Sequence, residues 1–150
     1  MKKSKYGKYV IYNSVMPPSA GTPPPPPPSG ERTGSSVLYV DDTILKGAFY
    51  FSCALIWKAS DRGSPPTSHS HNDYDEYIGF VGSNPEDPND LCGEVELWLG
   101  DEKHIITRSC AVFIPKGLSH CPVYFRRVDR PIVYFSTAPS TTYGKDQPKK

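Results

Sequence analysis

The sequence has no long apolar run, and this absence removes one class of protein at the outset. Its longest uninterrupted apolar runs contain five residues, as in Cys53–Trp57, whereas a helix that crosses a bilayer needs about 20. The basic N-terminus, Met1–Lys8, lacks the apolar stretch of about 7–15 residues that a secretory signal carries. We therefore expect a cytoplasmic protein with no membrane partner.

The chain also has little net charge. Its 150 residues include 17 Lys and Arg against 16 Asp and Glu, which gives a formal net charge of +1. So balanced a chain has no strong positive field with which to attract nucleic-acid phosphates or acidic lipids. We expect no nucleic-acid partner.

Cysteine is sparse as well. The four cysteines contain no C-x-x-C pair and show no dense disulfide framework of the kind that staples small secreted domains. We therefore predict reduced, mostly buried thiols. They are Cys53, Cys92, Cys110 and Cys121.

The apolar residues that are present lie mainly after residue 36. The first 36 residues contain 9 hydrophobic residues and the remaining 114 contain 46, so one core is expected in the later part. Eight of the 17 prolines lie between Pro17 and Pro28, and such a stretch forms neither helix nor central strand. We predict an N-terminal arm over residues 1–36 with a proline-rich linker at 17–36, a barrel domain at 37–140 and a polar C-terminal tail at 141–150. Within the arm, Tyr9–Tyr12 is expected to form an edge strand or to pack on the core.

Short runs of β-branched and aromatic residues, separated by turn residues, follow one another from Val37 onward, and helical periodicity is nowhere sustained. This pattern predicts an all-β fold, an antiparallel sandwich or closed barrel. The expected strands are Val37–Asp41, Ala48–Lys58, His69–Asn72, Tyr77–Val81, Glu94–Leu99, His104–Thr107, Ala111–Ile114, Cys121–Arg126 and Pro131–Thr137.

The run Ala48–Lys58 is apolar on both faces of the strand that it predicts. Alternation places five larger residues on one side and Tyr50, Ser52, Ala54, Ile56 and Lys58 on the other. We expect the larger set to face the core. It comprises Phe49, Phe51, Cys53, Leu55 and Trp57.

Three of the four histidines lie in a pattern typical of metal ligands. His69 and His71 are separated by one residue, so on a strand both rings point to one face, about 6–7 Å apart. Carboxylates follow at Asp75 and Glu76, and a third imidazole, His120, comes after a Pro-Gly turn. The fourth histidine, His104, lies in a charged stretch and is expected at the surface.

Such a donor set suits a divalent transition metal such as Fe, Mn, Ni or Zn, and leaves coordination positions open for a substrate. Without an ion, each imidazole inside an apolar barrel would need a hydrogen-bond partner, at a desolvation cost of a few kcal/mol. We therefore predict one divalent metal on His69, His71, His120 and one carboxylate.

These residues also resemble the two motifs of the cupin superfamily. The first, G-x5-H-x-H-x3/4-E-x6-G, is similar to the segment Gly63–Gly82, and the second, with P-x-G-x2-H, to Phe113–His120. Ser109 and Tyr124 replace the Gly and Asn that open and close the second motif, and neither position is a metal ligand in the family. The stretch from Asp75 to Pro122 is similar to small single-domain bacterial cupins of unassigned function.

The resemblance implies a jelly-roll β-barrel, or double-stranded β-helix, with a ligand pocket at its mouth. It leaves the carboxylate ligand open, because four intervening residues after His71 select Glu76 whereas three, or six counted back from Gly82, select Asp75. Neighbouring residues of a strand face opposite ways, so one of the two reaches the ion unless a bulge intervenes. We favour Glu76 for its longer reach.

Two functions fit these features. The first is a metalloenzyme of oxygenase, isomerase or decarboxylase type that acts on a small organic substrate, and the second is a non-catalytic module that binds or senses a small molecule. Tyr74, Asp75 and Tyr77 lie next to the ligands in the sequence and are candidates for proton transfer or orientation. An open sheet edge and an N-terminal arm can each bind a second copy of the chain, so we predict a homodimer.

Overall fold

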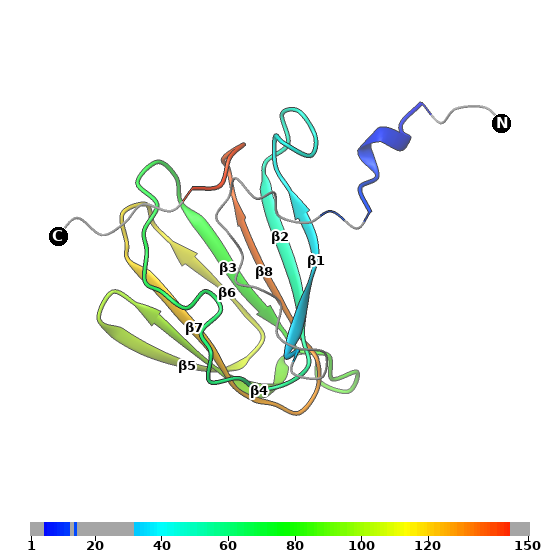
Figure 1. Ribbon diagram of the computed structural model, residues 1–150. Coiled ribbons are helices and arrows are strands. Elements are labelled where there is room, and N and C mark those ends of the chain that lie inside the picture. Colours follow the sequence, from blue (N-terminus) through cyan, green and yellow to red (C-terminus); the bar gives the residue numbers. More distant parts are fainter. Residues whose placement is uncertain (1–4, 13, 15–31, 145–150) are drawn as a thin grey trace.

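The structure, a computed structural model, describes residues 5–12, 14 and 32–144. Within this part of the chain, strands form nearly all of the regular structure (Figure 1). The strands are β1 (Gly34–Val40), β2 (Tyr50–Ile56), β3 (Glu76–Val81), β4 (Asp90–Leu99), β5 (Glu102–Arg108), β6 (Cys110–Ile114), β7 (His120–Val128) and β8 (Ile132–Ala138).

The strands form two antiparallel sheets. One contains five strands in the order β1-β2-β8-β3-β6, and the other contains three in the order β5-β4-β7. Apolar side chains from the two sheets pack into one core between them, as expected of a sheet that is apolar on one face. The fully buried members include Phe80, Leu91, Val95, Leu97, Val123 and Ile132.

The observed strands agree with eight of the nine predicted ones, with boundaries that shift by a few residues. The exception is His69–Asn72, where no strand forms and His69 makes an isolated antiparallel bridge with His120. Gly, Pro and Ser residues precede this bridge and Asn and Asp residues follow it, and such residues favour turns over continued pairing.

The prediction for the core face of Ala48–Lys58 is wrong. Tyr50 and Ile56 are 2% and 7% exposed, whereas Phe49 and Trp57 are 65% and 42% exposed. Both faces of this run are apolar, so alternation alone did not distinguish them. The inner face also carries polar contacts that the sequence pattern does not show, because the hydroxyl of Tyr50 lies 2.6 Å from that of Ser136.

The arm also differs from the expectation. Gly7–Tyr9 forms a short 3-10 helix, η1, and no edge strand forms among residues 5–12. Figure 1 shows this segment extending away from the sheets. Ile11 is half-buried, and the other apolar side chains of the segment are 54–78% exposed. They are Tyr6, Tyr9, Val10 and Tyr12.

The expected domain boundaries remain predictions, and the structure adds two details near them. β1 begins at Gly34, before the expected start of the barrel. Tyr143, within the expected tail, packs against the buried residues Tyr39, Tyr50 and Ala138.

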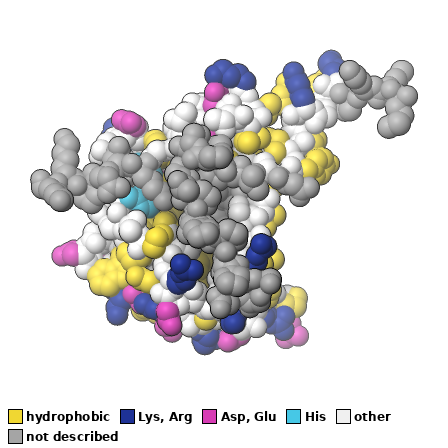
Figure 2. Space-filling model, viewed as in Figure 1, with side chains coloured by type: hydrophobic (Ala, Val, Ile, Leu, Met, Phe, Trp, Pro, Cys, Tyr) yellow, Lys and Arg dark blue, Asp and Glu magenta, His cyan; other side chains and the backbone are white. Residues whose placement is uncertain are grey.

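No disulfide links the four cysteines, but the prediction that most of their thiols are buried is wrong, because only Cys121 is fully buried. Among the described residues, no helix has the length and hydropathy needed to span a bilayer. On the face shown in Figure 2, basic and acidic side chains are interspersed rather than gathered by sign.

Candidate metal centre

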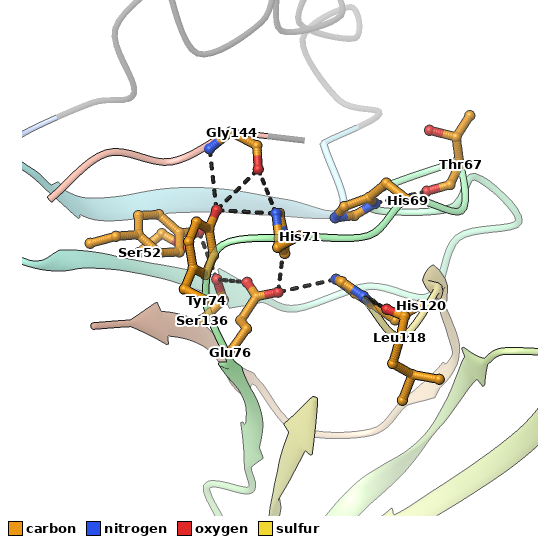
Figure 3. Close-up of polar contacts among 11 residues, drawn as sticks. Ser52, Thr67, His69, His71, Tyr74, Glu76, Leu118, His120, Ser136 and Gly144 are labelled. Atoms are coloured by element: carbon orange, nitrogen blue, oxygen red, sulfur yellow. Dashed lines mark hydrogen bonds and ion pairs between the residues drawn. The ribbon is translucent and has the colours of Figure 1, made fainter. Parts of the chain in front are cut away.

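The three histidines of the motifs meet at the end of the barrel where two distant segments pair. His69 and His120 exchange backbone hydrogen bonds, from each amide to the other's carbonyl, at 3.0 and 2.8 Å. His71 lies two residues after His69, and Glu76 is the first residue of β3, beside it. Figure 3 shows the side chains converging from these segments.

The cluster is buried and tight. His69, His71, Glu76 and His120 are 1–2% exposed. The centroids of the three imidazole rings lie 4.4–5.2 Å apart. Glu76 Oε2 lies 3.2 Å from His71 Nε2 and 3.1 Å from His120 Nε2.

Each imidazole turns its Nδ1 atom outward, toward a backbone carbonyl. His69 Nδ1 lies 3.2 Å from the carbonyl oxygen of Thr67, and His120 Nδ1 lies 3.0 Å from that of Leu118. His71 Nδ1 contacts the carbonyl oxygen of Gly144. A carbonyl can only accept a hydrogen bond, so the proton of each neutral ring is on Nδ1 and the lone pair is on Nε2.

A chain of hydroxyl groups holds the carboxylate of Glu76. Ser136 Oγ donates to Glu76 Oε1 at 2.9 Å, and the hydroxyl of Tyr50 lies 2.6 Å from Ser136 and 3.0 Å from that of Ser52. These residues come from the inner faces of β2 and β8. Anchored in this way, Glu76 presents Oε2 to the histidines.

Burial opposes ionisation of Glu76, but contacts with His120 and His71 outweigh it and lower the pKa of its carboxyl to about 2. The group is therefore a carboxylate at neutral pH. A buried charge of this kind requires a positive partner nearby.

The arrangement around Oε2 indicates what that partner is. Oε2 of Glu76 and Nε2 of His71 and His120 are buried, and none forms a well-aligned hydrogen bond with any described residue. With the protons of the neutral rings on Nδ1, the lone pairs on both nitrogens would repel the negative oxygen. The contacts that lower the pKa of Glu76 therefore require a cation between these nitrogens and Oε2, either an added proton on an imidazole or a metal ion. His71, Glu76 and His120 together could hold a metal ion, with ligand atoms within 4.8 Å of one another.

A bulge in β7 brings a thiol next to this cluster. Cys121 has a φ of 69°, and the register with β4 shifts between Leu97 and Leu99 at this point. Both His120 and Cys121 are consequently buried, although they are neighbours on one strand. The ligand atoms of His69, His120 and Cys121 also lie within 4.8 Å of one another.

The two alternative carboxylates are separated clearly. Glu76 lies with the imidazoles, whereas Asp75 Oδ1 accepts a hydrogen bond from the backbone N–H of Lys116 at 2.8 Å. Asp75 therefore fastens the turn that precedes His120. Alternation along the strand explains the difference, because adjacent side chains face opposite ways.

Of the three candidates for proton transfer, one reaches the centre and two lie outside it. Tyr77 is 48% exposed on the outer face of β3, where it contacts the ring of Phe113, so it lies outside the centre. Asp75 lies outside as well. Tyr74 does reach it: its ring stacks on that of His71, and its hydroxyl lies 3.1 Å from His71 Nδ1.

Sequence reasoning missed three contributors: Ser136, Tyr50 and the carbonyl of Gly144. The first two lie at inward positions of β8 and β2. A hydroxyl among apolar neighbours at such a position could have pointed to the site, but the inward positions are known only once the strand register is known. No sequence signal points to Gly144, because a backbone carbonyl is common to all residues.

Comparisons with known proteins place the fold. No protein-family model and no curated protein sequence matches the chain. Solved structures do match. An uncharacterised conserved protein with a double-stranded β-helix domain from Klebsiella pneumoniae subsp. pneumoniae MGH 78578 is 15% identical, covers 83% of this chain and 85% of its own, and has a TM-score of 0.50.

Oxalate oxidase in complex with the substrate analogue glycolate is 12% identical, with 79% of this chain covered and a TM-score of 0.51. The chain covers 56% of that protein's length. At these identities the likeness concerns the fold and not the reaction. The sheet order, the core and these neighbours confirm the predicted fold: the chain is an all-β jelly roll, or double-stranded β-helix.

Proposed function

We propose that the protein binds one divalent transition metal through His69, His71, Glu76 and His120, and acts as a metalloenzyme on a small organic substrate. The reaction would be of the oxygenase, isomerase or decarboxylase type. Fe, Mn, Ni and Zn all accept imidazole and carboxylate ligands, so the native metal depends on availability.

One observation carries this proposal. Nε2 of His71 and of His120 lies 3.1–3.2 Å from the carboxylate of Glu76 in a buried site, while Nδ1 of each ring faces a backbone carbonyl. A proton on one imidazole would satisfy that ring and leave the other repelling the carboxylate. A divalent ion satisfies every donor at once, which is why we favour a metal over a proton.

The chain's own residues would prepare this site before any substrate arrives. The carbonyls of Thr67 and Leu118 fix the tautomers of His69 and His120, and Ser136 orients Glu76. Such outer partners raise ligand basicity and hold ring orientation. A bound ion would supply a Lewis-acid centre with open positions for an organic acid, an enol or a sugar-like molecule.

A second candidate, a non-catalytic module that binds or senses a small molecule, is favoured by a different observation. Two of the three side chains considered for proton transfer, Asp75 and Tyr77, lie outside the cluster. The third, Tyr74, directs its hydroxyl to His71 and Gly144. A metal that only anchors a ligand needs no acid or base beside it.

Metal loading tests the site itself. Elemental analysis of the purified protein, followed by separate reloading with Fe(II), Mn(II), Ni(II) and Zn(II), should give about one ion per chain, the stoichiometry of a single centre. The His120→Ala variant should lose this ion, and His104→Ala should keep it, because His104 is exposed at the surface. Equal stoichiometry in both variants would overturn the assignment.

Turnover separates the two functions. The reloaded forms should be screened for O2 uptake and for loss of diketones, aromatic diols and keto acids, with oxalate and glycolate included as small acids. Product formation that depends on the metal supports the enzyme. A rise in melting temperature with a ligand, without product, supports the binding module.

We also propose that two copies of the chain pair through the outer face of the five-stranded sheet. Outward positions on β2, β8, β3 and β6 carry no charged side chain, and several are large and exposed, among them Tyr77 and Phe113 at about half exposure. A two-fold pairing places this face against itself, so two uncharged surfaces meet. The outward residues are Phe51, Cys53, Leu55, Val133, Phe135, Thr137, Tyr77, Gly79, Val81, Ala111 and Phe113.

Light scattering during gel filtration tests this pairing. The unmodified chain should elute with the mass of a dimer, and Phe113→Glu should elute as a monomer, since it buries a charge in the contact. Ile105→Glu is the matched control, because Ile105 is equally exposed but lies on β5 of the other sheet. A monomeric unmodified chain, or dissociation by both variants alike, would contradict the proposal.

A further inference from the structure

The segment Ser140–Gly144 crosses the mouth of the barrel and is fastened at several points. The carbonyl of Ser140 accepts from the backbone N–H of Tyr50 at 2.7 Å, and the carbonyl of Thr141 accepts from that of Asp42 at 3.0 Å. These bonds fix the first half of the segment to the strands and loop at the edge of the sheet. The second half can therefore reach the cluster of histidines.

The second half of the segment contacts that cluster directly. The ring of Tyr143 stacks on Tyr50 at a centroid distance of 4.3 Å and lies 5.3 Å from the ring of His71. Burial raises the pKa of the Tyr143 phenol. Tyr143 is thus a wall of the site and not part of a solvated tail.

Gly144 completes the contact through its backbone. Its carbonyl oxygen receives the Nδ1–H of His71 and, at 3.0 Å, the hydroxyl of Tyr74. Its N–H donates to the same hydroxyl at 3.2 Å. Figure 3 shows Tyr74, His71 and Gly144 linked in this small ring of hydrogen bonds.

We propose that Ser140–Gly144 is a positioning element of the metal centre, which holds His71 in its metal-binding tautomer through Gly144 and Tyr74. This inference rests on the proposed function, because it assigns the role of a segment at that same site. A histidine ligand whose second nitrogen is held by a carbonyl keeps its lone pair aimed at the ion. Metal binding and docking of the segment consequently favour each other, since each stabilises the same ring orientation.

The experiment compares Zn(II) affinity, measured by competition with a chelator, in the full chain and four variants. Two variants break the contact: a chain that ends at Ser140, and Tyr74→Phe, which keeps the ring on His71 but loses the hydroxyl. Two are controls: a chain that ends at Asp146, which keeps the whole segment, and Thr142→Ala. Thr142 is exposed in the same segment, and its hydrogen bonds with Ser140 use only its backbone.

We expect the two contact variants to bind Zn(II) about tenfold more weakly, within the range of about 10–100-fold seen for outer partners of metal ligands. Both controls should stay close to the full chain. Equal affinity in all five proteins would overturn the inference, and so would a loss in Thr142→Ala as large as that in Tyr74→Phe.

A second readout does not depend on metal. Imidazole 15N chemical shifts in the metal-free protein report the tautomer of His71, which should be the Nδ1–H form in the full chain and a mixture of tautomers in Tyr74→Phe. If no variant, including the full chain, binds metal, the proposed function fails while the shifts still decide the inference. If the chain that ends at Ser140 does not fold, Tyr74→Phe and the shifts decide it.

Discussion

The histidines of the centre are held in two different ways. His69 and His120 are oriented by carbonyls two residues upstream, those of Thr67 and Leu118, whereas His71 is oriented by Gly144, which lies 73 residues away in the sequence. A local carbonyl is in place as soon as its turn forms. The distant one is in place only when the C-terminal segment has docked. Two ligands are therefore preorganised by their own loops, and the third depends on the rest of the fold.

The largest effect should come from removing a locally held ligand. His69→Ala and His120→Ala each delete a donor, and we expect metal affinity to fall beyond the roughly 100-fold upper range of outer partners. The barrel should stay folded, because the histidines lie at its end and not in the apolar core. Elemental analysis and far-UV circular dichroism check both statements. Full metal occupancy in either variant would show that the substituted histidine is not a required ligand.

Next comes the carboxylate. Glu76→Gln removes the charge at the centre, and we expect metal affinity to fall by about 10–100-fold, with Asp75→Asn close to the unmodified chain. The reason is the geometry above, since Asp75 binds the N–H of Lys116 and not the cluster. Chelator competition on both variants measures the difference. A reversed order would show that Asp75 is the ligand.

A smaller effect is expected at Ser136. Ser136→Ala removes the donor to Glu76 Oε1, and the carboxylate should then hold the ion about tenfold more weakly, as for an outer partner. This value would give Ser136, on the distant strand β8, an effect as large as that of Tyr74. Calorimetric titration with Zn(II) gives the affinity, and Ser52→Ala, two steps further along the hydroxyl chain, is the control. An effect of Ser52→Ala equal to that of Ser136→Ala would refute the direct role.

The smallest effect should follow deletion of residues 1–31. The described part of this segment, residues 5–12 and 14, makes no contact with the centre in the structure, and its side chains are mostly exposed. Metal affinity should change by less than about twofold, as expected of an exposed terminus. A start at Arg32 retains the hydrogen bond from Trp57 Nε1 to its carbonyl. Loss of metal binding would place the arm in the site.

The fold and the cluster could be predicted because they rest on local patterns. Alternating apolar residues separated by turn residues predicted eight of the strands. The spacing of the motif histidines predicted that His69, His71 and His120 lie together, as they do in the structure. The partners of these residues could not be predicted. Ser136 and Gly144 meet the cluster only through long-range packing, and no short window of sequence contains either of them together with the ligand that it holds.

The sequence also did not predict correctly which face of β2 is buried, for a different reason. Phe49 and Trp57 are larger than Tyr50 and Ile56, so their burial looked more favourable by area alone. The buried face also carries the hydroxyl of Tyr50, which belongs to the chain of hydroxyl groups that ends at Glu76. A rule based on apolar area does not count such buried polar contacts.

The adjacent carboxylates Asp75 and Glu76 both contact the segment that joins β6 to the start of β7. The Asp75 carboxylate accepts from the amide of Lys116 and that of Glu76 faces His120, so this segment is tied to the start of β3 at two points. We expect a site tied in this way to accept ions with bonds of about 2.0–2.1 Å to nitrogen more readily than Ca²⁺, which takes six to eight oxygen ligands at roughly 2.3–2.6 Å.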